Sequence, residues 1–197
     1  IIPSWADGEA IQPIPKASNP FAEKHGFLNH LTVLYSGNLG LAHDLETIIQ
    51  AARELQNAPV LFVFIGEGGK KKILVEMVES LELQNVKFLP YQPIEELRFS
   101  LTSADISVVT MEAGVEGMII PSKIYGTLAA GQAVLGLVRE GSEIADILRE
   151  FKCGVTIQPK DVGAVVQLLR QCLHNPARLD EMKHRARQCF DEHFRKE

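Results

Sequence analysis

The stretch EGMIIPSKIYGTLAAGQAVL, residues 116–135, decides the fold because it holds a complete helix signal between two strand-like runs. Those runs, residues 105–110 and residues 133–138, are apolar and contain β-branched side chains, which favours strands. Pro121 and Ser122 are typical of a helix start, and Gly131 suits the left-handed position just after a helix end. A strand, a loop, a helix and a strand in this order form the repeating unit of a parallel α/β sheet.

The first turn of this predicted helix has the chemistry of a phosphate site. We expect Ser122 to cap its free N–H groups, while the helix dipole and the Lys123 ammonium add positive charge at the same point. A helix that follows a parallel strand begins at the edge where open α/β sheets bind ligands. An ordinary capped helix with a solvated lysine fits the same residues equally well.

The composition is that of a soluble globular protein without a general affinity for nucleic acid. Of the 197 residues, 46% are hydrophobic and 23% charged, and the net charge is -5. The three cysteines, Cys153, Cys172 and Cys189, lie far apart and lack the spacing of a zinc site. We therefore expect a cytoplasmic protein, no bound metal, and no membrane span, since every apolar run is too short to cross a bilayer.

Residues 1–30 carry four prolines and predict an extended connector from a domain upstream. From residue 31 on, strand-like and helix-like runs alternate. The predicted strands are residues 31–36, 60–65, 86–89, 105–110, about 133–137 and 154–157. They predict an α/β fold with a Rossmann-like, doubly wound, mostly parallel six-stranded sheet in residues 31–175. Residues 176–197 predict one last, strongly charged helix that begins at a proline.

The loops that follow the strands supply candidate ligand-binding groups, because the carboxyl ends of parallel strands line one crevice. Small residues there let the backbone approach a ligand, and polar side chains supply hydrogen bonds. Plain flexible turns, with residues 70–72 as a solvated helix face, are the competing interpretation. The candidates in chain order are Gly37, Asn38, Gly40 and His43; Gly66 and Glu67; Tyr91; Glu112, Glu116, Ser122 and Lys123; and Glu143.

Several motifs, taken in order, resemble the C-terminal domain of a GT-B glycosyltransferase of the retaining family 4. The branch that builds bacterial polysaccharides and O-antigens is the most similar. The order and spacing of the motifs carry the resemblance, since none is specific alone. The motifs are LYSGNLG (34–40), HDLE (43–46), FIGEG (64–68), VKFLPY (86–91), ADISVV (104–109), PSKIY (121–125), LAAGQAV (128–134) and GSEIA (141–145).

This resemblance implies that the chain is the donor-binding half of a transferase that uses a nucleotide-diphosphate sugar, a UDP- or GDP-sugar. A missing N-terminal domain would hold a saccharide or lipid-linked acceptor, residues 176–197 would cross back to it, and no cofactor would be needed. The isolated fragment would be inactive, because transfer needs both halves to position the two substrates. The longer protein would work in the cytoplasm, with peripheral membrane association as an option. Exposed connector side chains such as Trp5 would favour self-association of the fragment.

The chain also departs from the pattern of the broad family. The two positions of its Glu-x7-Glu motif fall on Met118 and Gly126, and neither residue is acidic. Glu116 is the candidate for a displaced catalytic carboxylate, and Lys123 is the candidate for stabilising the leaving diphosphate.

Two other functions remain open. A sugar-nucleotide epimerase of the same fold would use carboxylates such as Glu112, Glu116 and Glu143 to move protons, and sugar transfer to an acceptor would exclude it. A non-catalytic nucleotide-binding or interaction domain would account for the lost glutamate pair, and activity of the full-length protein would exclude that reading. We favour the transferase, on a resemblance of fold rather than of a proven site.

Overall fold

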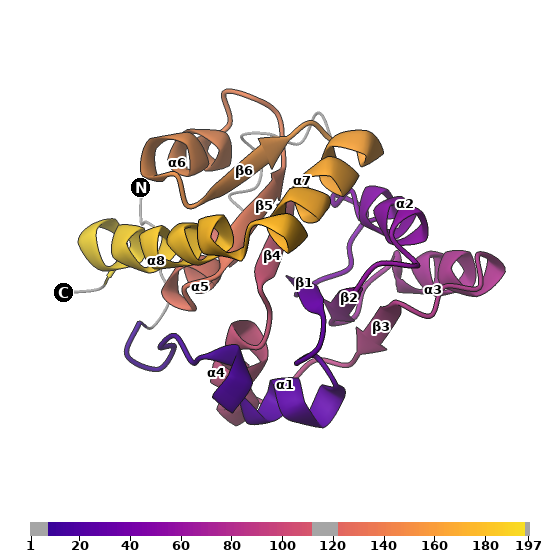
Figure 1. Cartoon of the computed structure of the whole chain (residues 1–197), viewed down its shortest axis with the longest axis horizontal. Coiled ribbons are helices and arrows are strands. Elements are labelled where there is room, and N and C mark those ends of the chain that lie inside the picture. The colour runs from indigo at the N-terminus through magenta and orange to yellow at the C-terminus, as the bar shows by residue number, and fades with distance from the viewer. Residues whose placement is uncertain (1–7, 112–121, 196–197) are drawn as a thin grey trace.

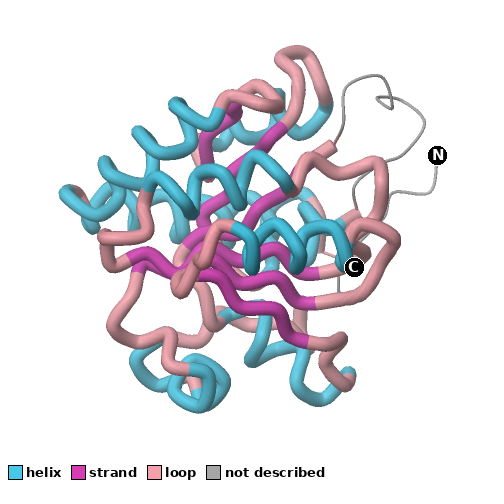
Figure 2. The backbone as a smooth tube through the Cα atoms, turned by 90° about the vertical axis from the view of Figure 1, so that its right-hand side faces the viewer, coloured by secondary structure: helices cyan, strands magenta, loops and turns pink. Residues whose placement is uncertain are grey.

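The computed structural model describes residues 8–111 and 122–195. In these ranges six strands form one parallel sheet, with helices on both faces (Figures 1 and 2). The predicted doubly wound α/β fold is therefore confirmed. The strands are β1 (Leu31–Ser36), β2 (Val60–Ile65), β3 (Val86–Leu89), β4 (Ile106–Thr110), β5 (Ala133–Leu137) and β6 (Gly154–Ile157). The helices are η1 (Lys16–Ser18), α1 (Pro20–His25), α2 (Glu46–Glu54), α3 (Lys71–Ser80), α4 (Ile94–Thr102), α5 (Lys123–Ala129), α6 (Glu143–Phe151), α7 (Val162–His174) and α8 (Pro176–His193).

The order of the strands fixes where a ligand can bind. The order is β3-β2-β1-β4-β5-β6, and β1 pairs in parallel with both β2 and β4. The chain leaves β1 toward one edge of the sheet and leaves β4 toward the other. The loops that follow β1 and β4 therefore diverge, and doubly wound sheets bind their ligands at such a switch point.

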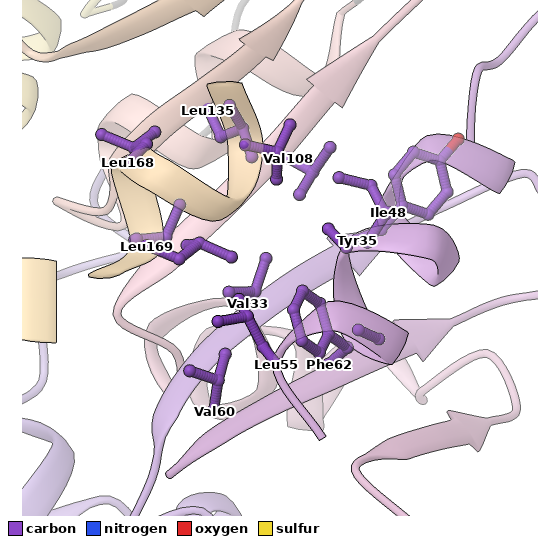
Figure 3. Packing of buried hydrophobic residues seen from close by; sticks show 14 of the residues in the cluster. Val33, Tyr35, Ile48, Leu55, Val60, Phe62, Val108, Leu135, Leu168 and Leu169 are labelled. Atoms are coloured by element: carbon purple, nitrogen blue, oxygen red, sulfur yellow. The ribbon is translucent and has the colours of Figure 1, made fainter. Parts of the chain in front are cut away.

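One face of the sheet carries a continuous apolar core under α2, α3 and α7. Val33 and Tyr35 of β1 and Phe62 of β2 point into this core, and Leu168 and Leu169 of α7 meet them from above (Figure 3). Full burial of an aliphatic or aromatic side chain contributes roughly 1.5–3 kcal/mol. The near-continuous apolar sequence of β1 and β2 fits a sheet that is covered on both faces.

The opposite face carries two separate apolar clusters. One, with Ile124, Leu148 and Phe190, joins α5, α6 and α8 to the strands. The other, with Phe21 and Leu34, joins the α1 region and α4 to β1 and β2. Between the two clusters the sheet carries the polar side chains of Ser36 and Ser107.

The segment before β1 is part of the folded domain. The predicted extended connector is wrong for Lys16 to His25, because these residues form η1 and α1. The Asn19 side chain accepts hydrogen bonds from the N–H groups of Phe21 (2.9 Å) and Ala22 (3.2 Å), and Pro20 follows at the first helical position. This Asn-Pro start is a helix signal that the count of prolines concealed. Trp5 lies outside the described residues.

Arg187 of α8 fastens the start of the described chain to α5. Its guanidinium donates to the carbonyl oxygens of Ala129 (2.7 Å), Ile11 (2.9 Å) and Gly8 (3.4 Å), and to Asp191 (2.9 Å). The first described residues, the end of α5 and the last helix therefore meet at one side chain.

A buried carboxylate joins three other segments. Asp105, just before β4, accepts hydrogen bonds from Lys16, from Lys183 of α8 (3.0 Å) and from the Thr32 N–H of β1 (2.9 Å). Burial acts to raise the pKa of Asp105, but the charges of Lys183 and Lys16 and the hydrogen bonds together hold it below its ordinary value. Burial lowers the pKa of Lys16 in spite of Asp105.

Replacing this carboxylate should destabilise the fold. Asp105→Ala leaves the half-buried Lys16 without its counter-charge, and losing a hydrogen bond to a charged group costs about 1.5–3 kcal/mol. Because the folded-state pKa of Asp105 is depressed, its contribution is present above pH 3.8, the ordinary value, and is lost as the pH falls below it. Urea unfolding at pH 7 and near pH 3 measures both effects.

The matched control is Asp146→Ala, which removes a carboxylate from the exposed pair with Arg149 and should change stability by less than about 1 kcal/mol. Equal stability of the two variants at pH 7 would show that Asp105 does not hold the segments together.

Candidate functional site

Lys123, the first residue of α5, reaches across the switch point to β1. Its ammonium contacts the Tyr35 hydroxyl, lies 4.1 Å from the centre of that ring and is 3.4 Å from the Asn38 carbonyl oxygen. A Cβ at Gly37 would lie 2.5 Å from Lys123 Cε, and the φ of Gly37 is +134°. Gly37 therefore leaves the path that the Lys123 side chain needs.

Lys123 is a half-buried cation that pairs with no carboxylate among residues 8–111 and 122–195. Burial lowers its pKa to about 8. The Tyr35 hydroxyl donates to the Asn38 carbonyl oxygen (2.6 Å), which leaves the phenolic oxygen to accept from Lys123. Burial raises the pKa of Tyr35, so the phenol stays neutral. The arrangement presents a positive charge that an anionic ligand can neutralise.

The expected helix cap at this point is absent. Ser122 is exposed, has helical backbone angles (φ -54°, ψ -17°) and makes no side-chain cap hydrogen bond, so the predicted cap is wrong. Since α5 has only seven residues, its dipole is a weak source of positive charge. Gly131 does take the predicted left-handed conformation, with φ +62°. Any phosphate affinity here must come mainly from Lys123.

His43 belongs to the loop that follows β1 and lies beside this group, against the end of β4. Its Nδ1 is 2.8 Å from the Thr110 carbonyl oxygen, and its ring lies 5.9 Å from the Tyr35 ring. Because a carbonyl oxygen only accepts, Nδ1 carries the hydrogen in this contact. The ring orientation is thus fixed by the end of β4, with His43 beside Tyr35, the residue that Lys123 contacts.

Asp44, a buried residue that was not among the sequence candidates, holds the loop after β1 in place. Asp44 accepts hydrogen bonds from the Thr47 N–H (3.2 Å), the Thr47 hydroxyl (2.8 Å) and the Lys160 N–H (2.8 Å). An aspartate three residues before a helical threonine is a recognisable cap signal. The loops after β1 and β6 are therefore fixed to each other by one carboxylate.

Lys70 has a structural role instead of the solvated one considered for it. It is 7% exposed, and its ammonium donates to the His43 carbonyl oxygen (2.7 Å) and to Glu46 (2.9 Å). It therefore fastens the start of α3 to the loop that carries His43. Lys71, next to it, pairs with Glu67.

The glycines of the first two loops serve the packing of one loop on the other. A Cβ at Gly66 (φ +140°) would lie 2.0 Å from the Gly37 carbonyl oxygen, and one at Gly68 (φ +155°) would lie 2.5 Å from the Leu39 carbonyl oxygen. Hydrogen bonds from the Leu39 N–H to the Glu67 oxygen and from the Lys70 N–H to the Leu39 oxygen, both 2.8 Å, continue the β1–β2 pairing. The close approach expected of a ligand at Gly66 is made by the neighbouring backbone.

The remaining described candidates are Tyr91, Gly40 and Glu143. Tyr91 is exposed beside Gly66, with its hydroxyl 3.4 Å from the Glu67 carbonyl oxygen, and Gly40 closes the first loop by accepting from the His43 N–H (3.2 Å). Glu143 lies apart and bonds the Tyr125 hydroxyl, whose pKa is raised by burial and by the Glu143 charge. Glu112, Glu116 and Met118 lie outside the described residues.

A hollow of about 170 Å³ extends beneath Lys123, between α4 and α5, where the two apolar clusters of that face fail to meet. The hydroxyls of Ser36, Ser107 and Thr127 line it, and none of them bonds another described residue. A Cβ at Gly126 would meet no atom within 4 Å. Ser107 and Thr127 are more than nine-tenths buried as residues, and their hydroxyls face the hollow, where water or a ligand can bond them.

Gly66→Ala tests the packing of the two loops. The Cβ would collide with the Gly37 backbone at a φ that L-residues rarely adopt, so we expect a loss of about 2–4 kcal/mol of stability. Gly69→Ala is the matched control, because a Cβ there meets nothing within 4 Å and should change stability by less than about 1 kcal/mol. Thermal unfolding compares the two, and an unaltered midpoint for Gly66→Ala would contradict the close approach of the loops.

The fold and this site define a doubly wound α/β domain with a cation at its switch point. The family profile described as Glycosyl transferases group 1 matches residues 19–189, and the chain belongs to this family. It is 30% identical to the putative colanic acid biosynthesis glycosyl transferase WcaI of Escherichia coli (strain K12) over 177 residues. The aligned region covers 88% of this chain and 44% of WcaI. It is 29% identical to the probable glycosyltransferase WbjE of Pseudomonas aeruginosa over 172 residues. The aligned region covers 85% of this chain and 42% of WbjE.

The chain thus spans less than half the length of these relatives. Among solved structures, Anabaena Alr3699/HepE in complex with UDP-glucose superposes with a TM-score of 0.81 at 15% identity, covering 97% of this chain and 52% of that one. The C-terminal domain of the group 1 glycosyl transferase LpcC from Francisella tularensis superposes with a TM-score of 0.76 at 14% identity, covering 98% of this chain and all of that one. At such identities the likeness shows the shared fold.

Proposed function

We propose that this chain is the donor-binding half of a transferase that moves a sugar from a nucleotide-diphosphate donor to a saccharide or lipid-linked acceptor. The observation that carries the proposal is the Lys123 ammonium, held at the switch point without a carboxylate partner among the described residues. Family membership supports sugar transfer, and the similar HepE structure contains UDP-glucose. The names of the relatives favour a role in bacterial polysaccharide biosynthesis.

The proposed work of Lys123 is electrostatic. Negative charge grows on the diphosphate as the bond to the sugar breaks, and a fixed ammonium in a partly buried site stabilises that charge. Tyr35 is the positioning residue, because its hydroxyl and ring hold the ammonium in place. His43, whose ring lies 5.9 Å from the Tyr35 ring, is proposed to border the same ligand.

The hollow beneath Lys123 is proposed to take hydroxyl groups of the donor. Ser107 and Thr127 can each donate and accept, which suits sugar hydroxyls, and the missing side chain of Gly126 leaves space for them. The hydroxyls of Ser36, Ser107 and Thr127 would then bind the donor in place of the carboxylate that the broad family has at the second position of its Glu-x7-Glu motif. That position is Gly126 in this chain. The donor is proposed to be a UDP- or GDP-sugar.

The finer features of the proposal rest on the resemblance. We propose transfer with retention of configuration, an acceptor bound by a further N-terminal domain, and a cytoplasmic setting, for which three free cysteines are typical. No helix in the described ranges is long and apolar enough to span a membrane. The epimerase alternative has less support, because Glu143 bonds Tyr125 and no described carboxylate reaches Lys123. A non-catalytic nucleotide-binding domain would share the binding predictions, and only assayed transfer separates it.

Lys123→Ala should weaken nucleoside diphosphate binding. A charge-assisted contact is worth roughly 1.5–3 kcal/mol, so affinity should fall by about ten- to a hundredfold. The unfolding midpoint should not fall, because the wild-type ammonium is buried at a cost. A thermal-shift screen of UDP, GDP and ADP selects the probe, and titration calorimetry measures its affinity.

The control for Lys123→Ala is Lys72→Ala on the exposed face of α3, since Lys71 is paired with Glu67 and is unsuitable. Wild-type affinity in Lys123→Ala would mean that the diphosphate does not sit at this lysine.

The affinity should also depend on pH. With a pKa of about 8, the ammonium is mostly charged at pH 7 and mostly neutral at pH 9, so affinity should fall roughly tenfold between them. Since the folded-state pKa lies below the ordinary 10.5, unliganded stability should rise with pH from about 8 to 10.5. Lys123→Arg stays charged and should bind with the same affinity at both values. An identical pH dependence in wild type and Lys123→Arg would assign the titration to another group.

A further inference from the structure

A second hollow lies far from the Lys123 site. It has a volume of about 350 Å³ and is lined by residues from the end of α6, the start of β6 and the first half of α8. Figure 1 shows where these three elements lie. The start of β6 is the amino edge of the parallel sheet, whereas Lys123 lies at the carboxyl edge. A ligand here would be separate from the donor diphosphate. The hollow is lined by Leu148, Arg149, Lys152, Gly154, Arg178, Glu181, Met182 and Arg185.

The lining concentrates positive charge in an acidic protein. It holds four cations and one carboxylate, while the whole chain has a net charge of -5. Arg149 pairs with Asp146 and Arg185 with Glu181, and Arg178 donates to the Gln171 side chain (3.2 Å). Each guanidinium has five N–H donors, so donors remain after these contacts. Lys152 is exposed and pairs with no described residue.

Helix electrostatics accounts for only part of this arrangement. Arg149 and Lys152 lie at the end of α6, where the helix dipole favours cations. Arg178 lies in the first turn of α8, where the dipole disfavours a cation, and that turn contains no acidic residue. The dipole of α8 therefore does not account for the position of Arg178, whose guanidinium shares the hollow with Glu181 and three other cations.

The backbone at the rim is strained at Lys152. Lys152 ends α6 with φ +52°, in the left-handed region that non-glycine residues seldom adopt. Glycine would relieve this strain, yet the chain places a lysine at the rim of the hollow. Backbone strain of this kind often accompanies a site that needs a particular side chain.

We propose that this basic hollow, formed by Arg149, Lys152, Arg178 and Arg185, binds the phosphate group of a second ligand. Planar guanidinium groups match phosphate oxygens in pairs, and three of them come from two helices here. The buried side chains of Leu148 and Met182 give the hollow an apolar wall, which suits a phosphate ester with an organic part. A soluble phosphate ester and a phospholipid headgroup both have this chemistry.

The test uses the 197-residue chain with the Lys123→Ala substitution, so that phosphate cannot bind at the proposed donor site. One arm titrates sodium phosphate at constant ionic strength and follows the unfolding midpoint. The other arm measures cosedimentation with phosphatidylcholine vesicles that contain phosphatidylglycerol. In each arm the double variant Arg178→Gln, Arg185→Gln is compared with Lys24→Gln, Lys72→Gln, which removes two exposed charges elsewhere.

We expect saturable binding in at least one arm and a loss of affinity of about ten- to a hundredfold in the arginine double variant alone. A response to phosphate ions without vesicle binding favours a soluble ester as the ligand, and binding to the vesicles that the arginine double variant loses favours a lipid headgroup. The proposal is overturned if neither probe binds, or if the control double variant loses as much affinity as the arginine variant. Unchanged UDP binding in an arginine variant that retains Lys123 would keep this site distinct from the donor site.

Discussion

The contact of Lys123 with Tyr35 across Gly37 is the constraint on which the site depends. It joins the first residue of α5 to β1, so it spans the two strands at which the sheet changes direction. It requires a glycine at position 37, a neutral phenol at position 35 and a lysine that tolerates partial burial. Each of these residues limits what the other two can be. A long flexible cation thereby acquires a fixed position without a carboxylate from the described residues to hold it.

The loops around this contact are positioned by groups that a ligand would not touch. Asp44 joins the loops after β1 and β6, Lys70 joins the loop after β1 to α3, and the glycines after β2 let two backbones meet. Buried polar groups of this kind are costly unless each finds a partner, and these do. The described loops are consequently held by contacts of their own, and the proposed ligand contacts of Lys123 and the hydroxyls beneath it are not needed to position them.

The sequence allowed the fold to be predicted well because its signals are local. Apolar runs of four to six residues, bounded by glycine and proline, marked all six strands, and their alternation with helices implied the parallel order. The site was predicted only in part. Gly37, His43 and Lys123 could be placed at one edge of the sheet, because topology alone brings the strand ends together.

What could not be predicted depends on contacts between distant residues. Nothing local distinguishes buried Lys70 from exposed Lys72, or shows that Gly66 faces Gly37 instead of a ligand. The roles of Tyr35, Ser107 and Thr127 depend on packing in three dimensions, because Tyr35 points into the core under α2, α3 and α7, Ser107 faces the other side of the sheet, and Thr127 lies on α5 itself. The helical segment before β1 was missed for a different reason, because Pro20 at a first helical position looks in sequence like a proline in a connector.

The Arg187 contacts have a mechanical consequence. One guanidinium holds the carbonyl oxygens of Gly8 and Ile11 and that of Ala129, the last residue of α5. Lys123 is the first residue of the same short helix. The same side chain therefore ties the backbone near residue 8 to the helix whose first residue is Lys123, so the two ends of the described chain and the switch point share one anchor.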